Sequence, residues 1–288
     1  MGLSQWTTRI IMVCTVITLA ACGDDPGEPP AAPPAGEDPG FIPVQDYASR
    51  GPYRTTSSTG GPDCTLFRPA DPGADGITHP VLVWGNGTFA TPGHYRDGLD
   101  HWASHGFVVV AADSSFPGSG DEMLDCLSWV LDQNTRSGPL RGAIATHRVG
   151  TSGHSQGGGG AVTVGADPRV STSAPMAPWN GFSDRSKWSQ QTGPMFINTL
   201  ENDGVASASG HSRPIFDAIN TPVFWGIIAG KGHNEAQPDF GAHRGPTTAW
   251  FRWQLMGDKA AGDLFVGDDC DLCKTRSGWL NIRKKGID

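Results

Sequence analysis

The sequence predicts an α/β domain in which helices cover both faces of a mostly parallel central sheet. Two observations lead to this prediction. Short, continuously apolar runs recur between residues 80 and 228, and such runs are typical of strands buried on both faces. Segments with the apolar spacing of helices separate the runs, and this alternation indicates parallel strands joined by helical crossovers.

Six apolar runs are expected to form strands. They cover residues 80–85, 106–112, 148–152, 170–174, 194–198 and 222–228. The expected helices cover residues 95–105, 121–133, 247–256 and a stretch that starts at Ala161. The helix over 121–133 has one apolar face, formed by Met123, Leu124, Leu127, Val130 and Leu131. The segment 176–192 is short and polar, so no lid over the sheet is expected.

The first 40 residues are expected to lie outside this domain. Residues 1–21 combine Arg9, a short apolar run and small residues before Cys22, and they look like a bacterial lipoprotein signal peptide with Cys22 as the lipidated residue. An ordinary secretory signal is the alternative. Residues 22–40 are rich in Pro, Gly and acidic residues, and they are expected to form a disordered tether. The folded domain is therefore expected over residues 41–288.

This N-terminus predicts an exported protein that is lipid-anchored to the bacterial cell envelope, with the outer membrane favoured, or else secreted. Membrane contact is expected only through that anchor, since the apolar run is shorter than the roughly 20 residues of a membrane span. The chain has 21 basic and 29 acidic residues and a formal net charge of −8. This charge argues against a nucleic-acid partner. We expect a monomer.

The cysteines agree with export. Cys64, Cys126, Cys270 and Cys273 remain within 41–288, and an even number in an exported chain indicates disulfides. Three pairings are possible. Cys270 and Cys273 are close enough for a local bridge, which leaves Cys64 to pair with Cys126. The Cys270–Cys273 motif could instead be a redox or zinc site, but the chain has no second motif of this spacing.

Gly153-His154-Ser155-Gln156-Gly157 fits the pattern G-x-S-x-G. The motif follows a predicted strand and precedes a predicted helix, as it does in α/β-hydrolases. The glycines let strand, turn and helix pack closely, and the turn presents the Ser155 hydroxyl at a helix N-terminus. The sequence therefore predicts a nucleophilic Ser155, and the alternative is a Gly-rich turn without chemistry.

A serine nucleophile needs a histidine base and a carboxylate that orients the base. Catalytic residues of such sheets follow the carboxyl ends of strands. Asp203 follows the strand over 194–198 and is the predicted acid, while Glu201 in the same turn is interpreted as a solvated loop charge. His233 follows the strand over 222–228 and is the predicted base.

The other histidines are weaker candidates for the catalytic base. His211 precedes a predicted helix, and His243 lies in a polar segment. His101 and His105 are four residues apart on a helix and could bind a metal, but no third ligand is evident, and a solvated helix face is the favoured interpretation. His154 is interpreted as structural. No metal and no organic cofactor are expected, because triad chemistry requires none.

The segment Gly153–Gly160 resembles the GHSxGGGG elbow of bacterial cutinases and poly(ethylene terephthalate) hydrolases. Further blocks resemble the same family: 103–109, 177–180, 201–203 and 232–233. The resemblance covers roughly residues 75–255 and implies an α/β-hydrolase fold. Residues 84–89 depart from the family's first oxyanion loop, and the lipobox, the tether and Cys270–Cys273 are unlike the secreted polyesterases.

The resemblance also implies roles for single residues. Ser155, His233 and Asp203 would form the triad, and the backbone N–H groups of Thr88 and Gln156 would form the oxyanion hole. Trp179 would stack beside the scissile ester, and Phe89 would replace the family's aromatic clamp one residue later.

The expected function is a serine carboxylic-ester hydrolase that acts through an acyl-enzyme. Its expected substrates are short-to-medium acyl esters, with aromatic polyesters such as poly(ethylene terephthalate) as a further class. The alternatives are a serine amidase or peptidase on the same fold, and a non-catalytic surface lipoprotein.

Overall fold

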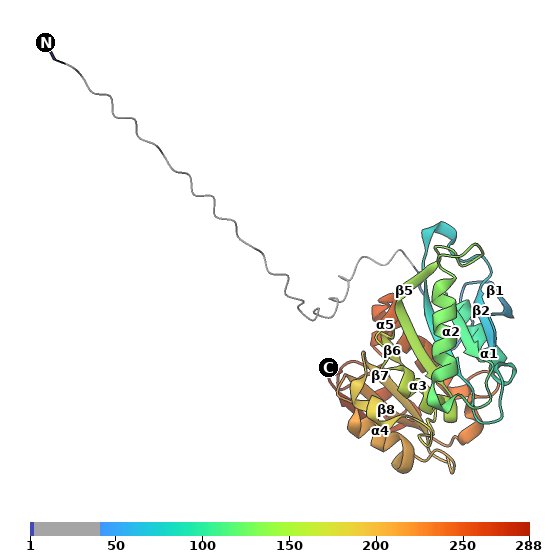
Figure 1. The fold of residues 1–288 in the computed structure, drawn as a ribbon. Helices are drawn as coiled ribbons and strands as arrows, with labels where there is room; N and C mark the ends of the chain where they lie inside the picture. The colour runs from blue at the N-terminus through green and yellow to red at the C-terminus, as the bar shows by residue number, and fades with distance from the viewer. Residues whose placement is uncertain (3–40) are drawn as a thin grey trace. The chain divides into compact units, whose positions relative to one another are not determined.

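The computed structural model describes residues 1–2 and 41–288, and residues 41–288 build a nine-stranded sheet with helices on both faces (Figure 1). The signal peptide expected over 1–21, the lipidated Cys22 and the tether expected over 22–40 lie outside the described residues. Within the described ranges, no helix is both long enough and apolar enough to cross a membrane.

The sheet is mixed but mostly parallel. Its strand order is β1-β2-β4-β3-β5-β6-β7-β8-β9, and the strands from β4 to β8 in this order pair in parallel. The strands are β1 Thr55–Thr59, β2 Cys64–Pro69, β3 His79–Gly85, β4 Val108–Ala112, β5 Ile144–Gly153, β6 Thr172–Ser173, β7 Met195–Leu200, β8 Val223–Ile228 and β9 Trp279–Lys285. The α-helices are α1 Arg96–Ser104, α2 Asp121–Asp132, α3 Gln156–Val164, α4 Arg213–Ala218, α5 Arg244–Met256 and α6 Lys259–Gly262.

The parallel centre agrees with the α/β-hydrolase fold expected from the sequence. All six predicted strands are present, although β6 contains only two residues where the apolar run 170–174 predicted five. Two helices begin earlier than predicted. α3 begins at Gln156, directly after the motif serine, and α5 begins at Arg244. The predicted starts were late because glycines and polar residues at a helix N-terminus weaken the apolar pattern.

The sequence analysis missed the antiparallel edges of the sheet. β1 pairs with β2, β2 pairs with β4, and β9 pairs with β8, all antiparallel. β1 reads TTSST and β9 ends in Arg283, Lys284 and Lys285. Edge strands carry polar and charged residues that discourage further pairing, and they therefore lack the continuous apolar run used as the strand signal.

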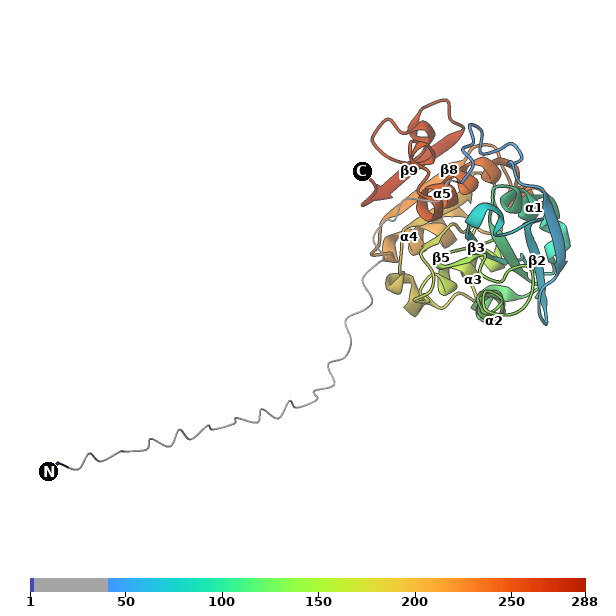
Figure 2. The same ribbon diagram turned by 90° about the horizontal axis from the view of Figure 1, so that it is seen from above.

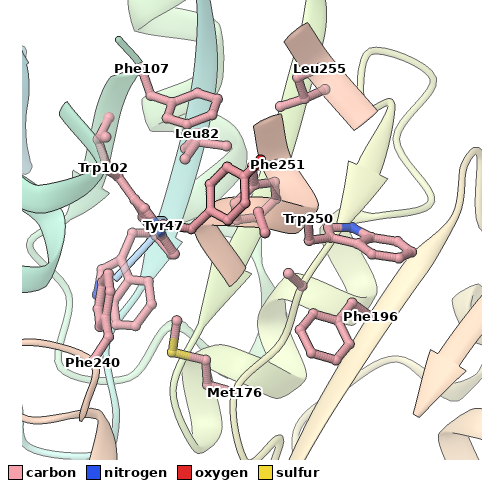
Figure 3. Close-up of a cluster of buried hydrophobic side chains, with 14 of the residues drawn as sticks. Tyr47, Leu82, Trp102, Phe107, Met176, Phe196, Phe240, Trp250, Phe251 and Leu255 are labelled. Atoms are coloured by element: carbon pink, nitrogen blue, oxygen red, sulfur yellow. The ribbon is translucent and has the colours of Figure 1, made fainter. Parts of the chain in front are cut away.

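Side chains alternate between the two faces of the sheet. On β3, Val81 and Val83 pack against α2 and α3, while Leu82 and Trp84 pack toward α1 and α5. Figure 2 shows α1 and α5 on one side of the sheet and α2 and α3 on the other. The larger core is rich in aromatic rings, and Figure 3 shows side chains of β3, α1 and α5 meeting there. Burial on both faces is the physical reason for the continuous apolar runs.

The interpretation of His101 and His105 as a solvated helix face was wrong. His101 is 6% exposed and His105 is fully buried. Their Nε2–H groups donate to the backbone carbonyls of Tyr47 at 3.0 Å and Ser49 at 3.0 Å. Burial lowers the pKa of His101 to about 3 and that of His105 to about 4. The segment that precedes β1 covers this face of α1, and the helical spacing alone could not reveal that cover.

The two disulfides have the pairing that the spacing favoured. Cys64–Cys126 joins the first residue of β2 to α2, and Cys270–Cys273 closes a short turn before β9. Disulfides of this kind are typical of proteins exported to an oxidising compartment.

Candidate active site

The predicted site residues lie beyond the carboxyl ends of parallel strands in the centre of the sheet. Ser155 follows β5, Asp203 follows β7 and His233 follows β8. Thr88 follows β3, which pairs with β5. Because these strands run in parallel, their carboxyl ends share one edge of the sheet, where loops from distant parts of the chain meet.

Ser155 occupies a strained turn between β5 and α3. Its φ is 56° and its ψ is −119°, in a region that residues with a side chain rarely adopt. The turn depends on close backbone contact, because a Cβ on Gly157 would overlap the carbonyl of Gly85 at the end of β3. The Gly157 N–H donates to the Asn86 carbonyl at 3.0 Å. The turn thus presents the Ser155 hydroxyl at the N-terminus of α3.

Hydrogen bonds connect Ser155, His233 and Asp203. Ser155 Oγ lies 2.8 Å from His233 Nε2, and His233 Nδ1 lies 2.8 Å from Asp203 Oδ2. A carboxylate only accepts hydrogen bonds, so Nδ1 carries the proton. In the neutral imidazole, Nε2 is then free to accept the hydroxyl proton of Ser155. A chain of this kind can activate a serine for attack on a carbonyl carbon.

The environment of Asp203 keeps its carboxylate ionised. Its side chain is fully buried, which opposes ionisation. The hydrogen bond from His233 and the backbone N–H groups of Ala206 at 2.7 Å and Val205 at 2.8 Å outweigh that burial. The pKa of the Asp203 carboxyl is therefore below its ordinary value.

The competing candidates have other partners. Glu201 is exposed, and its carboxylate accepts the N–H of Gly230 at 2.7 Å, which links the turns after β7 and β8. His211 stacks against the Trp179 indole at a centroid distance of 6.0 Å. His243 is completely buried rather than placed in an open polar loop, and burial lowers its pKa to about 3. The direct contacts of Ser155 therefore favour His233 over the other two histidines.

Two backbone N–H groups in the loops around the serine turn have no hydrogen-bond partner within the described residues. In the loop after β3, the N–H groups of Gly87, Phe89 and Ala90 donate to Tyr95 Oη, the Ser115 carbonyl and the Gly87 carbonyl. The N–H of Thr88 has no acceptor among residues 41–288, and the same holds for the N–H of Gln156. Unpaired donors near a nucleophile can stabilise an oxyanion.

Aromatic side chains border this site. Phe89, Phe116 and Phe182 are 79%, 53% and 61% exposed. The rings of Phe89 and Phe116 meet edge to face at 5.1 Å, and those of Trp179 and Phe182 meet at 5.3 Å. The backbone N–H of Trp179 donates to the backbone carbonyl of Ser155 at 2.8 Å, which connects this loop to the serine turn. We call Phe89, Phe116, Trp179 and Phe182 the aromatic rim.

Sequence patterns did not single out Phe116 and Phe182. Both lie in loops without periodicity, and each is one aromatic residue among polar and small neighbours. An aromatic residue shortly after a buried strand is a usable signal for Phe116, which follows β4 by four residues. No local signal marks Phe182.

Across residues 41–288, no three His, Cys, Asp or Glu side chains are grouped so that they could hold a metal ion.

Comparison with known proteins identifies relatives. The model of the family described as "PETase: PET hydrolase-like" matches residues 44–230. This range includes Ser155 and Asp203 and ends three residues before His233.

"Cutinase est2" of Thermobifida alba is 33% identical over 127 residues, which are 42% of this chain and 41% of the relative. "Cutinase 1" of Thermobifida cellulosilytica is 30% identical over 127 residues, 42% of this chain and 47% of the relative. The match therefore spans less than half the length of these cutinases. "Bis(hydroxyethyl) terephthalate hydrolase" of Streptomyces coelicolor is 27% identical over 236 residues, 75% of this chain and 70% of the relative.

Proposed function

Because the chain belongs to the PET hydrolase-like family of α/β-hydrolases, we propose that it is a serine carboxylic-ester hydrolase. The observation that carries this proposal is the pair of 2.8 Å hydrogen bonds that joins Ser155 to His233 and His233 to Asp203. The strained turn at Ser155 and the unpaired N–H groups of Thr88 and Gln156 support it.

In the proposed reaction, Ser155 Oγ attacks the ester carbonyl carbon while its proton moves to His233 Nε2. The N–H groups of Thr88 and Gln156 stabilise the resulting oxyanion. The tetrahedral intermediate then expels the alcohol, which takes the proton from His233, and the acyl group remains on Ser155. Water then attacks the carbonyl carbon of the acyl-enzyme while His233 Nε2 accepts its proton. The acid is released, and Ser155 Oγ takes the proton back from His233. Asp203 holds the His233 ring in the required tautomer throughout.

The proposed substrates are short-to-medium acyl esters and esters of aromatic acids, including aromatic polyesters. The aromatic rim supports this class, because edge-to-face and offset contacts favour the binding of an aromatic acid unit. A relative that matches 75% of this chain is named for an aromatic diester, bis(hydroxyethyl) terephthalate. Trp179, Phe89, Phe116 and Phe182 are the proposed contacts with the acyl part.

We also propose that residues 1–21 direct export and that Cys22 carries the lipid that anchors the domain to the cell envelope. Both disulfides agree with export. Metabolic labelling with a fatty acid tests the anchor. The full chain should become labelled and a Cys22→Ser chain should not, and equal labelling of both would exclude Cys22.

The hydrolase proposal is tested with the full chain and its Ser155→Ala variant on p-nitrophenyl butyrate, bis(hydroxyethyl) terephthalate and a polyester film. We expect wild-type turnover of both soluble esters and a loss of at least about 10⁴-fold in kcat in the variant. A fluorophosphonate should label the wild type alone. Cleavage of a matched amide but not its ester would favour an amidase. Full activity of the folded variant would overturn the proposal.

A further inference from the structure

A buried phenol, Tyr95, lies where three loops of the site meet. It is fully buried at the start of α1. Its Oη lies 3.1 Å from the Gly87 N–H nitrogen, 2.9 Å from His154 Nδ1 and 3.3 Å from Gln237 Nε2. One hydroxyl thus connects the loop after β3, the serine turn and the loop after β8.

The direction of each hydrogen bond follows from His154. Its Nε2 lies 2.7 Å from the backbone carbonyl of His233, which can only accept, so Nε2 carries a proton. Burial lowers the pKa of His154 to about 3, so the ring is neutral and Nδ1 is an acceptor. Tyr95 must therefore donate to Nδ1. Its oxygen accepts from Gly87 and Gln237, and burial raises the pKa of the phenol, which keeps it protonated.

Two partners in this network, Gly87 and His154, adjoin groups with a role in the proposed reaction. Gly87 precedes Thr88, whose N–H is a proposed oxyanion donor. His154 precedes Ser155, and its Nε2–H donates a hydrogen bond to the backbone carbonyl of His233, the proposed base. The space is tightly filled, because a Cβ added to Gly87 would lie 2.8 Å from Tyr95 Oη and 3.1 Å from His154 Nδ1.

We infer that Tyr95 is a positioning residue that uses its hydroxyl, through His154 and Gly87, to hold the oxyanion loop and the His233 loop against the Ser155 turn. The inference rests on the proposed hydrolase function. Removing the hydroxyl leaves His154 Nδ1 and the Gly87 N–H buried without partners, which favours a shift of the loops. Such a shift weakens binding of the oxyanion, which forms only in the transition state, more than binding of the ground-state ester.

The test is Tyr95→Phe, which keeps the ring and removes only the oxygen. The full chain is assayed on p-nitrophenyl butyrate, with kcat expressed per active site titrated by a fluorophosphonate. We expect kcat per site to fall about 10- to 100-fold while KM stays within about twofold. The affinity for an alkyl boronic acid, a transition-state analogue, should fall in parallel with kcat/KM. A merely structural role would lower the number of titratable sites and leave kcat per site unchanged.

Tyr47→Phe is the matched control, because the Tyr47 hydroxyl donates a hydrogen bond to Asp258 Oδ1 at 3.3 Å, away from the site loops. It should keep the wild-type kcat per site. Gln237→Met, which removes one donor to the phenol in a half-buried loop, is a second variant for the case that Tyr95→Phe does not fold. Its kcat per site should fall about threefold.

A wild-type kcat per site in Tyr95→Phe, or in Gln237→Met where that variant replaces it, overturns the inference. If Ser155→Ala is inactive in the same assay, the hydrolase proposal survives that result. If Ser155→Ala is as active as the wild type, the hydrolase proposal itself fails.

Discussion

At the scale of single residues, the turn after β7 contains two acids within three residues, and the two differ in burial and in hydrogen-bond partners. Asp203 is buried, accepts two backbone N–H groups and faces His233 Nδ1. Glu201 is exposed, and its carboxylate accepts the Gly230 N–H. A buried carboxylate with three donors is suited to hold a histidine in one tautomer, whereas an exposed one is screened by water.

We predict that Asp203→Asn lowers kcat by about 10⁴-fold with little loss of folded protein. The amide nitrogen would face His233 Nδ1 and favour the tautomer that cannot accept the Ser155 proton. Glu201→Gln is the matched control, and its kcat should stay within about threefold of the wild type. Steady-state kinetics on p-nitrophenyl butyrate measure both. The reverse pattern would assign the orienting role to Glu201.

At the scale of elements, the two disulfides close loops of very different length along the chain. Cys64 and Cys126 are 62 residues apart and join an antiparallel strand near the edge of the sheet to α2. Cys270 and Cys273 are three residues apart. A crosslink restricts the unfolded chain more strongly when it closes a longer loop.

We therefore predict unequal effects of removing the two bridges. Replacing Cys64 and Cys126 together by Ala should lower the free energy of unfolding by about 4 kcal/mol, and replacing Cys270 and Cys273 together by about 1.5 kcal/mol. Urea denaturation of the oxidised variants measures the difference. Equal losses would mean that strain in the folded state, rather than loop length, determines the contribution.

At the scale of the whole molecule, several neutral histidines are part of the interior. Burial lowers the pKa of His101, His154 and His243 to about 3 and that of His105 to about 4. The pKa of an unfolded histidine is about 6.5. Above that pH the rings are neutral in both states and the free energy of unfolding does not depend on them. Below it the unfolded chain binds protons that the folded domain does not.

Stability should therefore fall as the pH drops from about 6.5 toward 4, by up to about 1.4 kcal/mol per pH unit for each buried histidine. The melting temperature at pH 7.5, 6.0 and 5.0 measures this slope. His101→Gln should make the slope shallower, and His147→Gln, at an exposed position, should leave it unchanged. A wild-type melting temperature that is constant from pH 7 to pH 5 would contradict the prediction.

The sequence by itself determined the parallel centre of the sheet and the candidates for the triad. Both follow from local constraints: a strand buried on both faces is continuously apolar, and the turn at Ser155 requires glycines at fixed spacing. The order of Ser155, Asp203 and His233 along the chain then reduced the choice of acid and base.

Only the tertiary structure decided which groups share a buried space. The pairing of the polar edge strand β9 with β8, the burial of His101 and His105, and the contact of Tyr95 with His154 involve segments far apart in the chain. A histidine or a phenol has the same local pattern whether water or another loop covers it. Its partners, its protonation and its part in the site are set when distant loops pack together, because burial removes the competing water.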